Sequence, residues 1–269
     1  MPFEIFISLV LFGYGTIIGS FLNVVILRTA KKEQFVKGRS HCPTCNHVLA
    51  WYDLFPVLSW VSLGGKCRYC KVRISPRYAI VEFITGMSFV TAFLAFDISI
   101  AFAFAIVLFP ILICLSFFDI DTGEIEYWCP ISIAALGVVA TTLSLLGITD
   151  TVWYHHLIGA VIISAPFTIL LLFGGMGGAD VQLMAAAGLL LGWNIVPAAL
   201  IGILLGAIGG IIFKATTKTA PQSIYGDSDD PKQMKGTAMP FGPFLAVGIA
   251  AAFLCGDVMI DWYLRIMGG

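Results

Sequence analysis

The sequence predicts an all-α polytopic membrane protein with about eight transmembrane helices and a small zinc-ribbon-like loop domain after the first helix. Hydrophobic residues make up 59% of the 269 residues and charged residues only 12%, and the mean hydropathy is +0.95. This composition is typical of chains that cross a bilayer several times. The chain shows no alternating strand pattern of the barrel type, so a helix bundle is the expected architecture.

Apolar segments that are long enough to span the ~30 Å hydrocarbon layer recur along the chain. They lie at residues 3–27, 79–96, 99–118, 129–148, 157–173, 181–193, 196–213 and 241–263. The sixth segment is short and begins directly after Asp180. The first contains no Lys or Arg and no small-residue cleavage site, so we expect a retained helix rather than a removed signal peptide.

The distribution of positive charge predicts the orientation in the membrane. Ten of the fifteen Lys and Arg residues lie in residues 28–78, and four more lie in the polar loop 214–240. The positive-inside rule places both segments in the cytoplasm. Eight helices then put the amino terminus outside, and the connections 119–128 and 174–180 fall on the cytoplasmic face.

Three domains follow from this pattern. They are a first transmembrane helix at residues 1–27, a cytoplasmic domain with four cysteines at 28–78, and a transmembrane domain at 79–269. The net charge of −1 identifies no partner, and no nucleic acid is expected. The lipid bilayer is the one environment that the composition requires.

Four cysteines of the soluble segment form two C-x2-C pairs, Cys42 with Cys45 and Cys67 with Cys70, separated by 21 residues. Each pair can present two thiolates to one tetrahedral ion at ~2.3 Å. Because so small a loop buries little core, a structural zinc ion could supply its folding energy. The alternatives are unliganded thiols or two disulfides, and a cytoplasmic location argues against stable disulfides.

The other cysteines and two nearby histidines are expected to play no part in metal binding. His41 and His47 flank the first pair, but four thiolates already complete a tetrahedral site. Cys114, Cys129 and Cys255 lie in apolar surroundings and are predicted to be small core residues.

Two carboxylates, Asp119 and Asp180, lie where apolar segments meet the predicted cytoplasmic face. Acidic groups at membrane depth are costly and usually functional. If the two converge and share one proton, one can activate water while the other protonates the carbonyl of a peptide bond. The titration then belongs to the pair. This chemistry predicts an aspartyl protease.

Each aspartate also has a simpler interpretation. Asp180 follows a glycine-rich bend and could cap the next helix, although capping and catalysis can coexist. Asp119 could mark the end of a helix in an acidic loop that includes Glu124 and Glu126. Asp121 is its rival, and in a helical continuation the side chains of Asp119 and Asp121 face different directions.

Several motifs in order resemble the type IV prepilin peptidases, also called prepilin leader peptidase/N-methyltransferases, which are intramembrane aspartyl proteases of the GxGD type. The motifs are GSFLNVVILR, WYDLFPVLSW, GGKCRYCKVRISPRYAIVEFITG, GMGGADVQLMAAAGLLLGW and, from Met239, MPFGPFLA. The resemblance runs nearly end to end. It implies that Asp119, rather than Asp121, and Asp180 are the catalytic pair.

The sequence departs from the family pattern in three places. Ala179 replaces the second glycine of GxGD, and its methyl group could hinder close approach of the backbone. Glu126 and Tyr127 stand where the family usually has a Pro-Asp or Pro-Asn pair. Thr29 and Ala30 follow Arg28, where the family often has Leu-Pro. None of these changes removes a catalytic carboxylate, but they leave an inactive member as an alternative.

The resemblance implies a substrate, a location and a second activity. Family members remove the basic leader of prepilins or pseudopilins at the cytoplasmic face of the bacterial inner membrane. Since the soluble segment is itself basic, we expect acids such as Glu124 or Glu126 to bind the leader. Many members also methylate the new amino terminus with S-adenosylmethionine. Glu82 could serve that site, or it could pair with Arg73 or Arg77 and be structural.

Two other functions fit the same sequence. One is a non-enzymatic membrane scaffold or transporter with a zinc-stabilised loop, but the paired broken helices of many transporters are not evident. The other is an intramembrane protease with different substrates. His155 and His156 lie in a predicted external turn, on the wrong face for this catalysis, and are expected to be interfacial.

Overall fold

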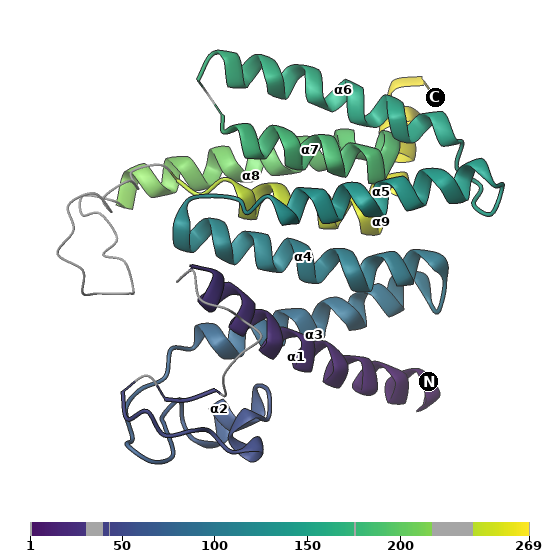
Figure 1. The fold of residues 1–269 in the computed structure, drawn as a ribbon. Coiled ribbons are helices and arrows are strands. Elements are labelled where there is room, and N and C mark those ends of the chain that lie inside the picture. The colour runs from purple at the N-terminus through teal and green to yellow at the C-terminus, as the bar shows by residue number, and fades with distance from the viewer. Residues whose placement is uncertain (1, 31–39, 43, 175, 217–238, 269) are drawn as a thin grey trace. The chain divides into compact units, whose positions relative to one another are not determined.

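The fold is helical (Figure 1), and the computed structural model describes residues 2–30, 40–42, 44–174, 176–216 and 239–268. Two compact units make up the chain, Met1–Cys114 and Leu115–Gly269. The helix α4 runs through their boundary. The division predicted at residues 28 and 79 stays a prediction.

The first unit is built on two long helices that cross closely. Its elements are α1 (Pro2–Ala30), the short 3₁₀ helix η1 (Trp51–Leu54), α2 (Leu58–Ser62), α3 (Arg77–Phe96) and the start of α4 (Ile100–Thr122). A Cβ atom on Gly19 of α1 would lie 2.7 Å from the Cα atom of Glu82 on α3, and one on Gly15 would lie 2.8 Å from Gly86. Small residues therefore allow the two backbones to approach, as is common between membrane helices.

The second unit holds the remaining helices. They are the end of α4, α5 (Trp128–Leu145), α6 (Trp153–Leu172), α7 (Gly178–Leu191), η2 (Gly192–Asn194), α8 (Ile195–Thr216) and α9 (Gly242–Gly268). A Cβ atom on Gly159 of α6 would overlap the backbone of Gly188 and Gly192. Close packing of glycines therefore joins α6 to α7 and to the turn that follows it.

The predicted fold class is confirmed, with a difference in how the spans are counted. Seven helical stretches of the described residues are long and apolar enough to cross a membrane. One of them, Gly178–Phe213, combines α7 and α8, which the sequence predicts as two segments. At Gly192 the backbone has a φ of 58°, and Figure 1 shows α7 and α8 running in opposite directions from this turn.

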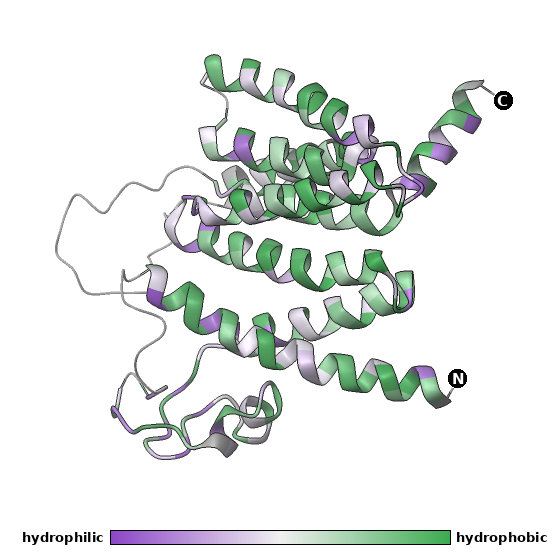
Figure 2. Cartoon of the chain, turned by 45° about the vertical axis from the view of Figure 1, so that its right-hand side comes forward, coloured by the Kyte–Doolittle hydropathy of each residue, from purple (hydrophilic) through white to green (hydrophobic). Residues whose placement is uncertain are grey.

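The polar residues concentrate at the helix ends and in the segment between α1 and α3 (Figure 2). α4 ends at Thr122, four residues beyond the predicted limit of 118, so Asp119 lies within its last turn. Likewise α7 begins at Gly178 rather than after Asp180. Most of the predicted polar loop 214–240 lies outside the described residues.

Candidate functional site

Asp119 is a buried carboxyl group at the end of an apolar helix. Asp119 is 6% exposed, whereas Asp121, two positions further along the chain, is only half-buried. The backbone N–H of Gly242 donates a hydrogen bond of 2.6 Å to Oδ2 of Asp119. The first residue of α9 is thus joined to the last turn of α4, across 123 positions of sequence.

Gly242 is required at this contact because a side chain would not fit there. Its backbone does not adopt a conformation that only glycine favours. A Cβ atom there would lie 2.8 Å from Oδ2 of Asp119 and 3.2 Å from its Cβ atom. Any larger residue would therefore displace the carboxyl group. Sequence reasoning did not assign this role, although MPFGPFLA was among the motifs that indicated the family.

Asp180 is the third residue of α7, and its carboxylate caps the helix. The backbone N–H of Gly177 donates to Oδ2 of Asp180 at 3.2 Å. Gly174, with a φ of 70°, makes the bend that precedes the helix. This hydrogen bond caps the start of α7 from the third residue of the helix, and Gly177 holds the N-cap position that the sequence suggested for Asp180. It uses one carboxylate oxygen, so capping leaves Oδ1 available for chemistry.

Ala179 occupies a regular helical position and has no positive φ. The conformational freedom of a glycine is therefore not needed there. Its neighbour Gly178 has open space around it, since a Cβ atom would meet nothing within 4 Å. The departure from GxGD thus causes no backbone strain in α7.

The two aspartates belong to the same compact unit, and Figure 1 shows that the end of α4 and the start of α7, which carry them, lie on the same side of it. Each accepts a hydrogen bond from a glycine N–H, Asp119 from Gly242 and Asp180 from Gly177. The site therefore contains two carboxyl groups, each held in place by a backbone amide.

The acidic connection after α4 lies next to this site in sequence. Glu124 is exposed, and its backbone N–H is bonded to Oγ1 of Thr122 at 3.2 Å. Glu126 is half-buried, and Tyr127 precedes α5 with 69% of its surface exposed. These residues form an accessible acidic segment within a few positions of Asp119.

The four cysteines of the soluble segment converge. All four Sγ atoms lie within 4.8 Å of one another, and those of Cys42 and Cys70 are 3.8 Å apart. A tetrahedral ion with Zn–S bonds of ~2.3 Å requires Sγ separations of about 3.8 Å. The donor set therefore fits one tetrahedral metal ion.

Two equivalent turns present these thiols. We name them the first knuckle (residues 41–48) and the second knuckle (residues 66–73). Each is closed by an antiparallel bridge, His41 with Val48 and Lys66 with Arg73. In each, the residue after the second cysteine has a positive φ, 54° at Asn46 and 61° at Lys71. Beyond the cysteines the two turns share little sequence.

The pKa values of Cys42 and Cys70 are shifted in opposite directions. Burial raises the pKa of Cys42, but hydrogen bonds from the backbone of Cys45 and Thr44 outweigh it and lower the pKa to about 7. The backbone of Val72 lowers the pKa of Cys70, but burial and the neighbouring thiols raise it to about 11. A cation at the centre would favour the thiolate at every position.

Asp53 stabilises the segment between the two knuckles through hydrogen bonds. It accepts hydrogen bonds from Arg68 at 2.7 Å, from Tyr69 at 3.1 Å and from the backbone of Ala50 at 3.3 Å. Burial raises the pKa of Asp53, but these donors hold it below its usual range. His47 stacks on Tyr69, with ring centroids 3.6 Å apart, and lies outside the four-sulfur cluster.

Glu82 links α3 to the soluble segment. Its Oε2 atom accepts a hydrogen bond of 2.8 Å from the backbone N–H of Val57. Val57 has a φ of 59°, which is costly for a β-branched residue and persists only where the surroundings impose it. This contact gives Glu82 a structural role, with the backbone of Val57 as its partner.

His156 also has a structural role, while His155 packs among rings. The ring of His156 is buried and lies 3.1 Å from the carbonyl of Leu189 and 3.2 Å from Oγ of Ser144. It thus joins α5, α6 and α7. His155 contacts the ring of Trp193.

The remaining cysteines are packed within or between helices. Cys114 and Cys129 are fully buried, and the thiol of Cys255 donates to the carbonyl of Ala251 within α9. Their predicted burial in apolar surroundings is confirmed for the first two. Cys255 is only half-buried.

Comparison with known proteins gives consistent matches along the chain. Residues 14–96 match the bacterial peptidase A24 N-terminal domain, and residues 106–213 match the type IV leader peptidase family. No solved structure matches at comparable significance.

Three curated relatives carry the same name, prepilin leader peptidase/N-methyltransferase. The protein of Bacillus subtilis is 32% identical over 97% of this chain and 99% of its own length. That of Myxococcus xanthus is 35% identical over 82% of this chain and 67% of its own. That of Pseudomonas aeruginosa is 28% identical over 94% and 92%. The chain therefore belongs to the type IV leader peptidase family and is an enzyme of the aspartic prepilin leader peptidase/N-methyltransferase class.

Proposed function

We propose that this protein is an intramembrane aspartyl endopeptidase that removes the basic leader of type IV prepilins or pseudopilins, with Asp119 and Asp180 as its catalytic pair. The observation that carries the proposal is the presence of two carboxyl groups at one end of an apolar helical unit, each held by a glycine amide. Family membership supplies the substrate class.

The hydrogen bonds suggest which oxygen atoms of the two carboxyl groups take part in catalysis. A backbone N–H donates only to a lone pair, so Oδ2 of Asp119 and Oδ2 of Asp180 are both used as acceptors. The Oδ1 atoms then hold the shared proton and the water. The ionised carboxylate removes a proton from water as it attacks the carbonyl carbon, and the protonated one donates to the carbonyl oxygen. The peptide C–N bond then breaks as the amine takes up a proton.

We propose the cytoplasmic face of the bacterial inner membrane as the place of cleavage and an extracytoplasmic amino terminus. The support is the concentration of Lys and Arg in residues 28–78 and 214–240. The first of these segments is proposed as a cytoplasmic zinc-binding domain, because its four thiols fit a tetrahedral ion. The proposed division assigns residues 1–27 to the preceding transmembrane helix and residues 79–269 to the peptidase domain.

Methylation of the new amino terminus is the second proposed activity. It comes from the relatives' names, which include N-methyltransferase. S-adenosylmethionine would supply the methyl group, and no side chain of this protein is assigned to it. Glu82 holds the backbone of Val57, so its effect on methylation would be through the position of the soluble segment.

The direct test is a reaction of the purified protein in lipid nanodiscs with a full-length prepilin. Mass spectrometry is expected to find the mature pilin with its leader removed, and a further 14 Da (the mass of one methylene group) only when S-adenosylmethionine is added. An intact prepilin after incubation would refute the peptidase. Leader removal without the further 14 Da in the presence of S-adenosylmethionine would refute the methyltransferase activity alone.

Charge reversal of the acidic segment should weaken substrate binding. We expect Glu124→Lys with Glu126→Lys to raise KM for prepilin about tenfold, because a basic leader then meets like charges, while kcat changes little. The control is Asp150→Lys, an exposed acid in the connection at the opposite end of α5. An unchanged KM in the double variant would exclude this segment from leader binding.

Gly242→Ala should abolish most of the activity. The added methyl group would lie 2.8 Å from Oδ2 of Asp119, so either the carboxyl group or the start of α9 must move. Because catalysis depends on sub-ångström placement, kcat should fall roughly 100-fold or more. Gly178→Ala is the matched control, since its methyl group enters open space beside Asp180. Equal activity of the two variants would contradict the role of Gly242.

A further inference from the structure

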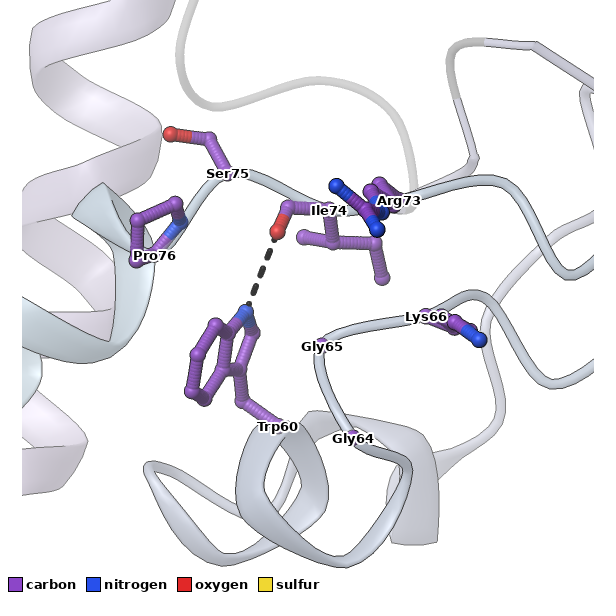
Figure 3. Close-up of a pocket in the computed structure, with 8 residues that line it drawn as sticks. All are labelled: Trp60, Gly64, Gly65, Lys66, Arg73, Ile74, Ser75 and Pro76. Atoms are coloured by element: carbon purple, nitrogen blue, oxygen red, sulfur yellow. Dashed lines mark hydrogen bonds between the residues drawn. The ribbon is translucent and has the colours of Figure 1, made fainter.

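A pocket of about 510 Å³ lies between the second knuckle and the start of α3 (Figure 3). Figure 3 shows Trp60 and Pro76 at one end of the pocket and Lys66 and Arg73 at the other. All of these residues belong to the first compact unit. Neither the catalytic pair nor the four thiols use this pocket.

The wall that Trp60 forms is held in place. The indole N–H donates to the carbonyl of Ile74 at 3.2 Å, as the dashed line in Figure 3 marks. Gly65 packs against the indole, where a Cβ atom would lie 2.9 Å from the ring. The φ of Gly65 is 67°, so its backbone conformation also favours glycine. The pocket is therefore a preformed feature of the loop.

The opposite end of the pocket is cationic. Lys66 and Arg73 are paired across the bridge that closes the second knuckle, so their side chains start from adjacent backbone positions. Both are exposed, and the part of the chain that the structure describes pairs neither with a carboxylate. The equivalent positions of the first knuckle, His41 and Val48, carry no fixed charge. The second knuckle alone thus offers two adjacent cations to an anion.

The pocket lies at the entrance of a membrane helix. Pro76 lines it and is the residue that precedes α3, and Arg77–Phe96 is a candidate membrane span. The hydrogen bond from Val57 to Glu82 fixes the start of α2 against the second turn of α3. The segment that carries Trp60 is therefore held at the level where α3 enters the bilayer.

The same segment exposes apolar side chains. Leu54, Leu58 and Val61 are 40%, 66% and 63% exposed. Leu58 and Val61 are one helical turn apart and so lie on the same face of α2. An exposed apolar face with cations beside it is the pattern of segments that lie in the headgroup region of an anionic membrane.

We propose that α2 docks on the bilayer surface, with Leu58 and Val61 inserted among the lipids and the phosphate of an anionic headgroup bound between Lys66 and Arg73. The charge of the two cations complements that of the phosphate. The tether at Glu82 fixes the depth of insertion. This site is independent of the peptidase reaction and would anchor the loop beside α3.

The apolar contact can be tested by photocrosslinking of the full chain in nanodiscs that contain phosphatidylglycerol. With benzoylphenylalanine at Leu58, we expect mainly lipid adducts, identified by mass spectrometry. With the same probe at Thr44, an exposed position in the first knuckle, lipid adducts should be at least fivefold fewer. Equal yields, or adducts of Leu58 mainly with protein, would overturn the docking of α2 on lipid.

The headgroup site can be tested by the retention of phosphatidylglycerol on the detergent-purified protein, followed by native mass spectrometry. Lys66→Gln with Arg73→Gln should weaken retention about 10- to 30-fold, because each cation contributes to binding at an anionic surface. Lys71→Asn, which removes an exposed cation from the tip of the same knuckle, should have little effect. Equal loss in both variants, or displacement of the lipid by millimolar inorganic phosphate, would overturn the lipid headgroup site.

Discussion

Asp119→Asn and Asp180→Asn are each expected to reduce prepilin cleavage roughly 1,000-fold or more. The reaction needs one ionised and one protonated carboxyl group, and an amide can neither remove a proton from water nor supply one to the carbonyl oxygen. Asparagine keeps the shape of the side chain, and its oxygen can still accept from Gly242 or Gly177. The change therefore removes the acid–base chemistry while preserving the local hydrogen bonds. Initial rates of leader removal in nanodiscs measure the effect.

Asp121→Asn is the matched control for this experiment, because it changes an aspartate of the same helix turn. It should keep most of the activity, since Asp119 rather than Asp121 is buried and bonded to Gly242. Full activity of either Asp119→Asn or Asp180→Asn would exclude the pair. A loss confined to Asp121→Asn would move the first carboxylate by two positions. An unchanged metal content in each variant would show that the soluble segment remains folded.

Removal of the metal site should unfold the two knuckles. We expect Cys42→Ser with Cys67→Ser to abolish zinc binding, because each substitution removes one of four thiols that lie within 4.8 Å of one another. Structural zinc contributes about 10–16 kcal/mol to the folding of small zinc domains, and this segment buries little core that could replace it. Amide hydrogen exchange should show loss of protection in residues 40–76, measured beside zinc content by elemental analysis.

Cys255→Ser provides the control for the loss of a thiol. The serine hydroxyl group can replace the thiol as donor to the carbonyl of Ala251, and position 255 lies far from the knuckles in sequence. Zinc content and exchange in residues 40–76 should then equal those of the wild type. One zinc ion per chain in the double variant would show that the four thiols are not the ligands. Normal protection without zinc would show that the knuckles fold without a metal.

The sequence was sufficient for features that depend on local pattern. Hydropathy located the long helices to within a few residues, because a membrane span requires an uninterrupted run of apolar side chains. Hydropathy was less accurate at the helix ends. α4 continues through Asp119 to Thr122, since backbone hydrogen bonding can extend a helix past its apolar stretch. The C-x2-C spacing likewise predicted that four thiols would meet.

The contact between Asp119 and Gly242 depended on the tertiary structure. The two residues are 123 positions apart, and no periodicity in either helix specifies which residue faces which. The choice between Asp119 and Asp121 rested on family resemblance at the level of sequence. In the structure, the packing of α4 in the second unit buries the first and leaves the second half-buried.

The sequence by itself thus determined the membrane class, the positions of the helices, the four thiols and the two candidate aspartates. The membrane class, the helix positions and the thiols follow from composition or from spacing within a short segment, whereas the choice of Asp119 over Asp121 followed from family resemblance. Only the tertiary structure decided what holds them: Gly242 against Asp119, Gly177 against Asp180, and Glu82 against the strained backbone of Val57. Such contacts depend on how closely helices approach, and glycines such as Gly19 and Gly159 allow that approach through the absence of a side chain.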